Sequence, residues 1–158
     1  MKPIKFHHDA LDVAKWFLRR NNAEAILNEA DDISNLKLQK LLYYAQGICL
    51  GMTGEVLFDD SIVAWQHGPV VISVYDKYCV YGRSGIIYTD DLAPREEYTE
   101  AEEDILNKVY DYFGQFSAWK LRNMTHEEAP WQNTPKNHVI DVALIKDYFE
   151  RHYIADED

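Results

Sequence analysis

The chain has little cysteine. Only two occur among its 158 residues, Cys49 and Cys79, and they are too few and too far apart to form a metal-binding motif or a disulfide framework. Cys49 falls at helical spacing from other apolar residues, so we expect its side chain to be buried like a small hydrophobic residue. The sequence therefore predicts neither a cysteine-based metal centre nor a disulfide-stapled fold.

The chain also lacks a long apolar run. No segment offers the roughly 20 consecutive apolar residues that a membrane-spanning helix needs. Residues 1–6 (MKPIKF) lack the apolar stretch of a secretory signal peptide. From these two absences we expect a cytoplasmic protein that does not enter a membrane.

Basic charge is scarce. Lysine and arginine together number 16 against 27 aspartates and glutamates, which gives a formal net charge of −11. A surface this acidic repels phosphate backbones, so direct nucleic-acid binding is not expected. The charge would suit a basic protein partner, because opposite potentials accelerate encounter, although solubility alone also explains it.

The chain does contain enough apolar material for one core. Hydrophobic residues make up 47% of it and charged residues 27%, so we expect a single globular domain over residues 1–158. Aromatic residues are abundant at 13%, with eleven tyrosines and four tryptophans. They fit either a tyrosine-rich core and rim or a dedicated aromatic binding face.

The strongest local pattern is an apolar stripe that predicts a long helix. The members of the stripe are Leu38, Leu41, Leu42, Ala45, Cys49 and Met52. Ser34 is a favourable N-cap, and the helix is expected to run to about Thr53 and to stop at Gly54. Gly47 and Gly51 lie on its flank, where they would let another element pack closely.

Five further helices are predicted from capping residues and apolar spacing. They begin at or just after Asp9, Pro69, Thr99, Ser117 and Asp141. The first is expected to end near Arg20, before a polar connector, and the helix that Pro69 opens is expected to reach about Tyr81.

Extended structure is predicted for three short segments. Residues 56–58 and 62–65 flank a turn-like run and are expected to form a short hairpin or a pair of extended segments. Residues 86–88 are expected to form a further strand. The expected fold class is mainly α: a compact, single-domain bundle of about six helices with a small β hairpin or short sheet.

No catalytic constellation emerges from the polar residues. His126 and Glu127 match the start of a zinc-protease helix motif, but the second histidine would fall at Pro130. His67 and His138 lack acidic or cysteine partners at ligand spacing, so a structural role is favoured for each. Because no catalytic residue, metal site or cofactor motif is found, the pattern favours a binding module over an enzyme.

Several short segments resemble one known family. They are residues 38–47 (LQKLLYYAQG), the pair Ala64-Trp65, residues 67–70 (HGPV) and the pair Pro130-Trp131. Their order and spacing resemble the Panacea domain, the SocA-like antitoxin family that includes many phage-associated bacterial proteins. The resemblance implies a toxin-neutralising protein that binds a cognate toxin directly.

The resemblance leaves two routes to neutralisation open. The chain could sequester the toxin, or it could act as an adaptor that delivers the toxin to a ClpXP-type protease. Neither route needs a cofactor or catalysis by this chain. An enzyme that uses a cluster of carboxylates is a third, separate class.

Five residues are candidates for toxin contact: Lys37, Lys40, Tyr44, Trp65 and His67. The first three follow i, i+3, i+7 spacing away from the apolar stripe and are expected to form one surface ridge. Trp65 and His67 stand beside the next turn, where a rigid element could present them as binding hot spots. The alternative is that Trp65 is core and that the two lysines belong to a solvated face.

Overall fold

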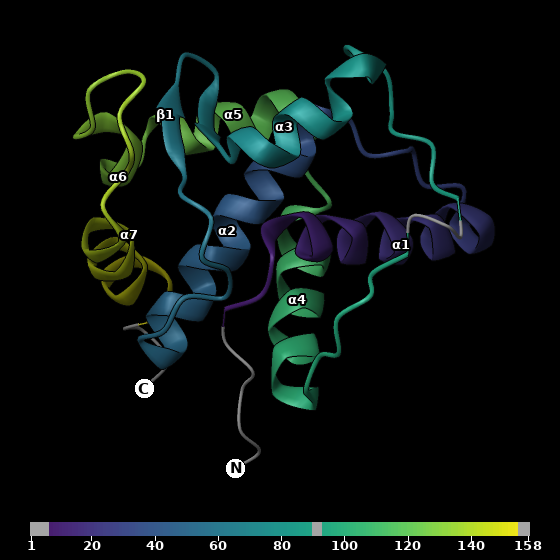
Figure 1. Ribbon diagram of the computed structural model, residues 1–158, viewed down its shortest axis with the longest axis horizontal. Coiled ribbons are helices and arrows are strands. Elements are labelled where there is room, and N and C mark those ends of the chain that lie inside the picture. The colour runs from purple at the N-terminus through teal and green to yellow at the C-terminus, as the bar shows by residue number, and fades with distance from the viewer. Residues whose placement is uncertain (1–6, 90–92, 155–158) are drawn as a thin grey trace.

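The computed structural model describes residues 7–89 and 93–154, and most of them are helical (Figure 1). The α-helices are α1 (Ala10–Asn28), α2 (Asn35–Thr53), α3 (Ile72–Tyr78), α4 (Glu100–Phe113), α5 (Ala118–His126), α6 (Ala129–Gln132) and α7 (Val142–Phe149). A 3-10 turn, η1 (Cys79–Tyr81), extends α3, and a π-helical turn, η3 (Glu150–Ile154), extends α7. Two strands, β1 (Val63–Trp65) and β2 (Gly68–Val70), pair antiparallel. The prediction of a mainly helical fold with a small β element is confirmed.

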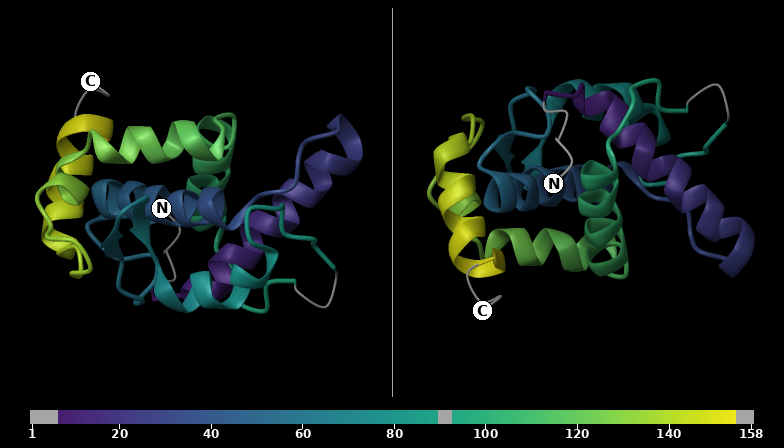
Figure 2. Two further views of the ribbon diagram at one scale, coloured as in Figure 1. Left: turned by 90° about the horizontal axis from the view of Figure 1, so that it is seen from above. Right: turned by 90° about the horizontal axis from the view of Figure 1, so that it is seen from below.

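Helix α2 is the centre of the structure. Helices α1, α3, α4, α5 and α7 and strand β2 all pack against it, and Figure 2 shows it lying among them from above and from below. Every residue from 38 to 47 is buried. A helix that is covered on every side is a core element, not an amphipathic surface helix. Among the described residues, no helix is both long enough and apolar enough to span a membrane.

The two ends of α2 lie where the sequence predicts them. The Ser34 side chain accepts a hydrogen bond from the amide of Lys37, which satisfies one free donor of the first turn. Gly54 ends the helix with φ of 81°, in the left-handed region that favours glycine.

The predicted close approach at the α2 glycines is also confirmed. A Cβ atom on Gly47 would lie 2.3 Å from the ring of Phe149, and one on Gly51 would lie 2.9 Å from Ile154. Helix α7 and the η3 turn can therefore pack directly on the backbone of α2.

The hairpin lies later in the chain than predicted. Trp65 pairs with Gly68 across a two-residue turn, and Pro69 lies inside β2 opposite Ala64. Gly68 has φ of 111°, a conformation that glycine adopts without strain. The expectation that Pro69 opens a helix is therefore wrong, and α3 begins at Ile72.

Residues 56–58 and 62–65 do not pair with each other as a hairpin. The His8 amide donates to the carbonyl of Leu57 at 2.8 Å, and the Ala64 amide donates to the carbonyl of His138 at 3.0 Å. Both segments are extended. Residues 63–65 pair locally with β2, whereas the contacts with His8 and His138 join the two segments to residues distant in sequence. Local turn signals could not reveal pairings of this kind, because they depend on how the helices pack.

Helix α1 extends beyond its predicted end near Arg20 and reaches Asn28. Arg20 pairs with Glu24 at 2.9 Å, and Asn28 donates to Glu24 at 2.8 Å, both at i, i+4 spacing. Asparagine is a weak helix former, which is why the polar run predicts a connector. These side-chain pairs stabilise the helix across this polar run.

Two smaller elements also differ from the prediction. Residues 86–88 form no strand in the described structure, and the Ile86 amide donates to the carbonyl of Ile33 beside an isolated bridge. The one-turn helix α6 was not predicted. Pro130 stands in its first turn, where the missing N–H costs nothing.

Candidate functional site

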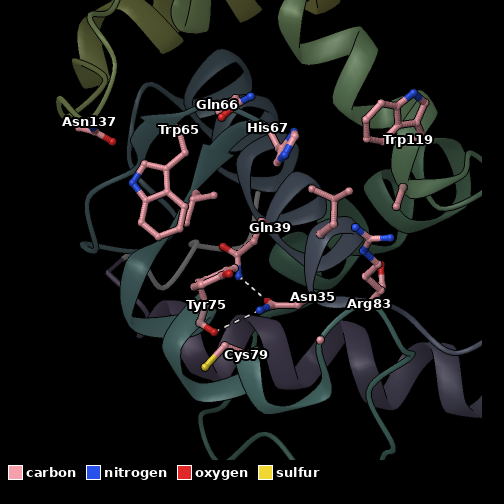
Figure 3. Close-up of a pocket in the computed structure, with 15 residues that line it drawn as sticks. Asn35, Gln39, Trp65, Gln66, His67, Tyr75, Cys79, Arg83, Trp119 and Asn137 are labelled. Carbon is pink, nitrogen blue, oxygen red and sulfur yellow. Dashed lines mark hydrogen bonds between the residues drawn. The ribbon is translucent and has the colours of Figure 1, made fainter.

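A surface groove lies between the start of α2, the β-hairpin, α3 and the start of α5. It encloses about 950 Å³ and is lined in part by Asn35, Gln39, Trp65, His67, Tyr75 and Trp119 (Figure 3). Its volume falls in the range of clefts that bind ligands or peptide segments. Two of the predicted contact residues, Trp65 and His67, line this groove.

Trp65 forms one side of the groove and is held from two directions. Its indole ring packs edge-on against Tyr75 with ring centroids 5.0 Å apart. Its backbone carbonyl accepts a hydrogen bond of 2.7 Å from the Trp131 indole nitrogen. The end of β1 is therefore fixed to both α3 and α6, and the half-buried Trp65 ring is presented rigidly.

On the other side, His67 and Trp119 are exposed and the half-buried Arg122 contacts both; we call these three side chains the Trp119 cluster. The Arg122 guanidinium lies 4.4 Å from the centre of the Trp119 ring, a cation–π contact, and its Nε atom donates to His67 Nδ1 at 3.4 Å. Trp119 is 56% exposed, although tryptophan is usually well covered. An ordered but exposed tryptophan is a typical binding hot spot.

A chain of amide hydrogen bonds forms the floor of the groove. Gln39 accepts from the Val71 amide at 2.9 Å and donates to the Asn35 side chain at 2.9 Å. Asn35 in turn donates to the carbonyl of Tyr75 at 3.1 Å. These bonds tie α3 and its N-cap, Val71, to α2, so the groove is pre-formed before any partner binds.

The expected surface ridge on α2 is wrong for two of its three residues. Lys40 and Tyr44 are 0% exposed, because the hairpin covers Lys40 and side chains of α4, α7 and η3 cover Tyr44. Lys37 is half-buried, and its ammonium group donates to the carbonyl of Gly114 at 2.7 Å. Helical spacing places residues on one face, but it does not reveal that a second layer covers that face.

Lys40 lies directly beneath the hairpin. Its Nζ atom donates to the carbonyl of Pro69 at 3.1 Å, and burial, with the nearby charge of Arg122, lowers its pKa to about 7. A Cβ atom on Gly68 would lie 2.6 Å from Cε of Lys40, so only glycine lets the hairpin close over this side chain. Lys40 therefore supports the groove from below and does not reach its surface.

Tyr44 belongs to a buried cluster around Glu128. The hydroxyls of Tyr43, Tyr44 and Tyr153 donate to this carboxylate at 2.9, 3.0 and 2.7 Å. Burial raises the pKa of Glu128, while the three hydroxyl donors oppose that rise. The Tyr44 ring also stacks on Phe113 at 3.9 Å. This cluster fixes α2 to the C-terminal turn η3.

A second buried polar cluster joins the first described residues to α4. His8 contacts Glu96 at 2.6 Å through Nδ1 and Glu102 at 2.7 Å through Nε2, and its ring stacks on Tyr98. Glu102 also completes the predicted capping box with Thr99. In the part of the chain that the structure describes, no group of three or more histidine, cysteine, aspartate or glutamate side chains could hold a metal ion.

Sequence reasoning missed Trp119 and Arg122. A signal was available, because Trp119 follows the Ser117 N-cap and falls off the buried stripe of α5, which is made by Leu121 and Thr125. A tryptophan off the apolar stripe of a short helix indicates an exposed aromatic surface.

The fold and the groove define a helical protein built around one buried helix, with an aromatic groove open at its surface. The chain belongs to the Antitoxin SocA-like, Panacea domain family, whose model matches residues 38–132. It is similar to Antitoxin SocA from Caulobacter vibrioides (strain NA1000 / CB15N), with 46% identity over 55 residues. That match covers 35% of the chain and 29% of the relative, so less than a third of the relative is spanned. No solved structure matches the chain significantly.

Proposed function

We propose that the chain is an antitoxin that neutralises a cognate toxin by direct binding, and that the groove is its main contact surface. Family membership supports the antitoxin role. The observation that carries the contact surface is the Trp119 cluster, an aromatic and cationic set beside a rigid floor. Aromatic and arginine side chains on rigid elements contribute most to protein–protein affinity.

A binding role without catalysis fits the disposition of the titratable groups. Burial shifts the pKa values of Lys40 and Glu128, but Lys40 donates to a backbone carbonyl and Glu128 accepts from three tyrosine hydroxyls of the protein itself. Both lie beneath the surface, where they stabilise the helices that frame the groove. Trp65 and His67 remain proposed contact residues, and Trp119 and Arg122 join them.

The proposal is tested by co-expression with the protein encoded beside this chain. Wild-type chain should restore growth, whereas the double variant Trp119→Ala with His67→Ala should lose most of that protection while its melting temperature stays unchanged. The matched control is Leu27→Ala, since Leu27 is 78% exposed on α1, outside the groove. If the double variant protects as well as wild type, the groove is not the contact surface.

The same experiment separates sequestration from delivery to a protease. Repeated in a host that lacks ClpXP, it should still show full protection if the chain sequesters the toxin. Protection that disappears in that host, while purified chain still binds the toxin, would establish the adaptor route in place of sequestration.

A further inference from the structure

The groove differs in charge from the rest of the molecule. The chain carries a net charge of −11, yet among the described residues that line the groove there is no aspartate or glutamate. Among the described residues, its charged lining residue is Arg83, and His67 and Trp119 of the Trp119 cluster line it as well. The groove is therefore a local region of neutral to positive potential on an acidic protein.

Two arginines at this groove are available to bind an anion. Arg83 is exposed and lies on the same side as Trp119, across from Trp65 (Figure 3). Within the described parts of the chain, neither Arg83 nor Arg122 has a carboxylate at ion-pair distance. Arg122 donates through Nε to His67 and through Nη1 to Asn123, and no hydrogen bond joins its Nη2 to another described residue, so Nη2 can donate to a ligand.

Two basic groups beneath the hairpin respond to the charge of Arg122. Arg122 lowers the pKa of both Lys40 and His126, after the larger effect of burial. These groups therefore disfavour one another's positive charge. A carboxylate brought in by a partner would relieve that repulsion, and arginine is the side chain that pairs with carboxylates in two-point geometry.

We propose that the groove receives an acidic, aromatic-containing segment of the toxin, with carboxylates on Arg83 and Arg122 and an apolar side chain between Trp65 and Trp119. This inference rests on the proposed function and names the chemistry of the partner. A nucleic acid is disfavoured as the occupant because the remaining surface repels a phosphate backbone. The acidic surface outside the groove is free to meet basic parts of the same toxin.

A partner-independent test uses short synthetic peptides labelled with fluorescein. One alternates aspartate with tryptophan, the second has asparagine and the third has lysine in place of aspartate. Fluorescence anisotropy should give the tightest binding for the aspartate peptide, by at least about tenfold over the lysine peptide. In the variant Arg83→Glu with Arg122→Glu that order should be lost. Equal affinities, or tighter binding of the lysine peptide to wild type, would overturn the inference.

The second test uses the protein encoded beside this chain and calorimetry. Arg83→Glu with Arg122→Glu should weaken binding at least about tenfold, because charge reversal places like charges together. Arg83→Glu alone leaves the Trp119 cluster intact and should also weaken the binding. The matched control, Arg19→Glu with Lys108→Glu, makes the same change of charge on exposed positions of α1 and α4. The control should leave the affinity nearly unchanged.

The outcomes distinguish this inference from the proposed function. If Trp119→Ala weakens binding while both arginine variants and their control bind like wild type, the groove is the contact surface and its occupant is not acidic. If no groove variant affects binding, the contact surface is elsewhere, and the inference falls with it. If the wild-type chain does not bind the toxin, the proposed function itself is wrong.

Discussion

Lys40 supports the groove from below without lying in it. Its side chain is fully buried between α2 and the hairpin, and its pKa is about 7 instead of the ordinary 10.5. The unfolded chain therefore binds more protons than the folded chain between these two values. Linkage then requires the free energy of unfolding to rise with pH across that window.

Replacing Lys40 with methionine should remove this dependence. Between pH 7 and pH 9, unfolding in urea should show the wild-type free energy rising relative to Lys40→Met, by up to about 1.4 kcal/mol per pH unit. Lys108→Met, at an exposed site, serves as the control and should parallel wild type. Parallel curves for wild type and Lys40→Met would show that Lys40 keeps its ordinary pKa in the folded protein.

At this scale the sequence predicted the site only in part. Trp65 and His67 do lie at a turn, but the turn joins Trp65 to Gly68, whereas Gly68 and Pro69, where it was expected, belong to β2. Lys40 and Tyr44 were misplaced because helical spacing is blind to a second layer of packing. Trp119 and Arg122 come together with His67 only through the fold, since 52 residues of sequence separate His67 from Trp119.

At the scale of elements, close contact between α2 and α7 depends on the absence of a side chain at Gly47. The ring of Phe149 occupies the space where a Cβ atom on Gly47 would lie, at 2.3 Å, and Phe149 is 0% exposed. An added methyl group must displace this ring or separate the two helices. The buried Phe149 ring and the two packed helices cannot move without a cost in free energy.

Gly47→Ala should therefore destabilise the protein by about 1–3 kcal/mol, the usual cost of overpacking a core. In the background Phe149→Ala the same substitution should be neutral or mildly stabilising, because alanine favours a helix over glycine by about 1 kcal/mol. Urea unfolding of the four proteins in this double-mutant cycle measures the coupling. Equal effects of Gly47→Ala in both backgrounds would show that the ring does not fill this space.

The elements also show which structural signals are local. The capped ends of α2 and α4 were predicted correctly, because a cap is read from a few adjacent residues such as Ser34, or Thr99 with Glu102. The longer-range contacts were not, because the Leu57 carbonyl accepts from the His8 amide and the Ala64 amide donates to the His138 carbonyl across the fold. Pairing of this kind is decided by tertiary packing, which short-range patterns do not contain.

At the scale of the whole molecule, charge and shape divide the surface into two regions. Most of the chain is acidic, whereas the groove is lined by aromatic and cationic side chains. Trp65, His67, Arg83 and Trp119 all lie within residues 38–132, the stretch that matches the family. We therefore expect the groove to carry partner recognition and the acidic surface to influence the rate of encounter.

The two cysteines provide a direct probe of this division. Cys79 is exposed and lines the groove, whereas Cys49 is buried and its pKa is raised to about 11 by burial. A maleimide should therefore label Cys79 selectively in the folded chain, because the thiolate is the reactive species and Cys49 is shielded. No engineered residue is needed at the proposed contact surface.

The rate of Cys79 labelling, followed by mass spectrometry with and without saturating toxin, tests the central claim that the groove is where the toxin binds. If the toxin covers the groove, labelling becomes at least about tenfold slower in a complex shown to be intact by gel filtration, since only unbound chain can react. An intact complex in which Cys79 reacts as fast as it does in the free chain would contradict the account.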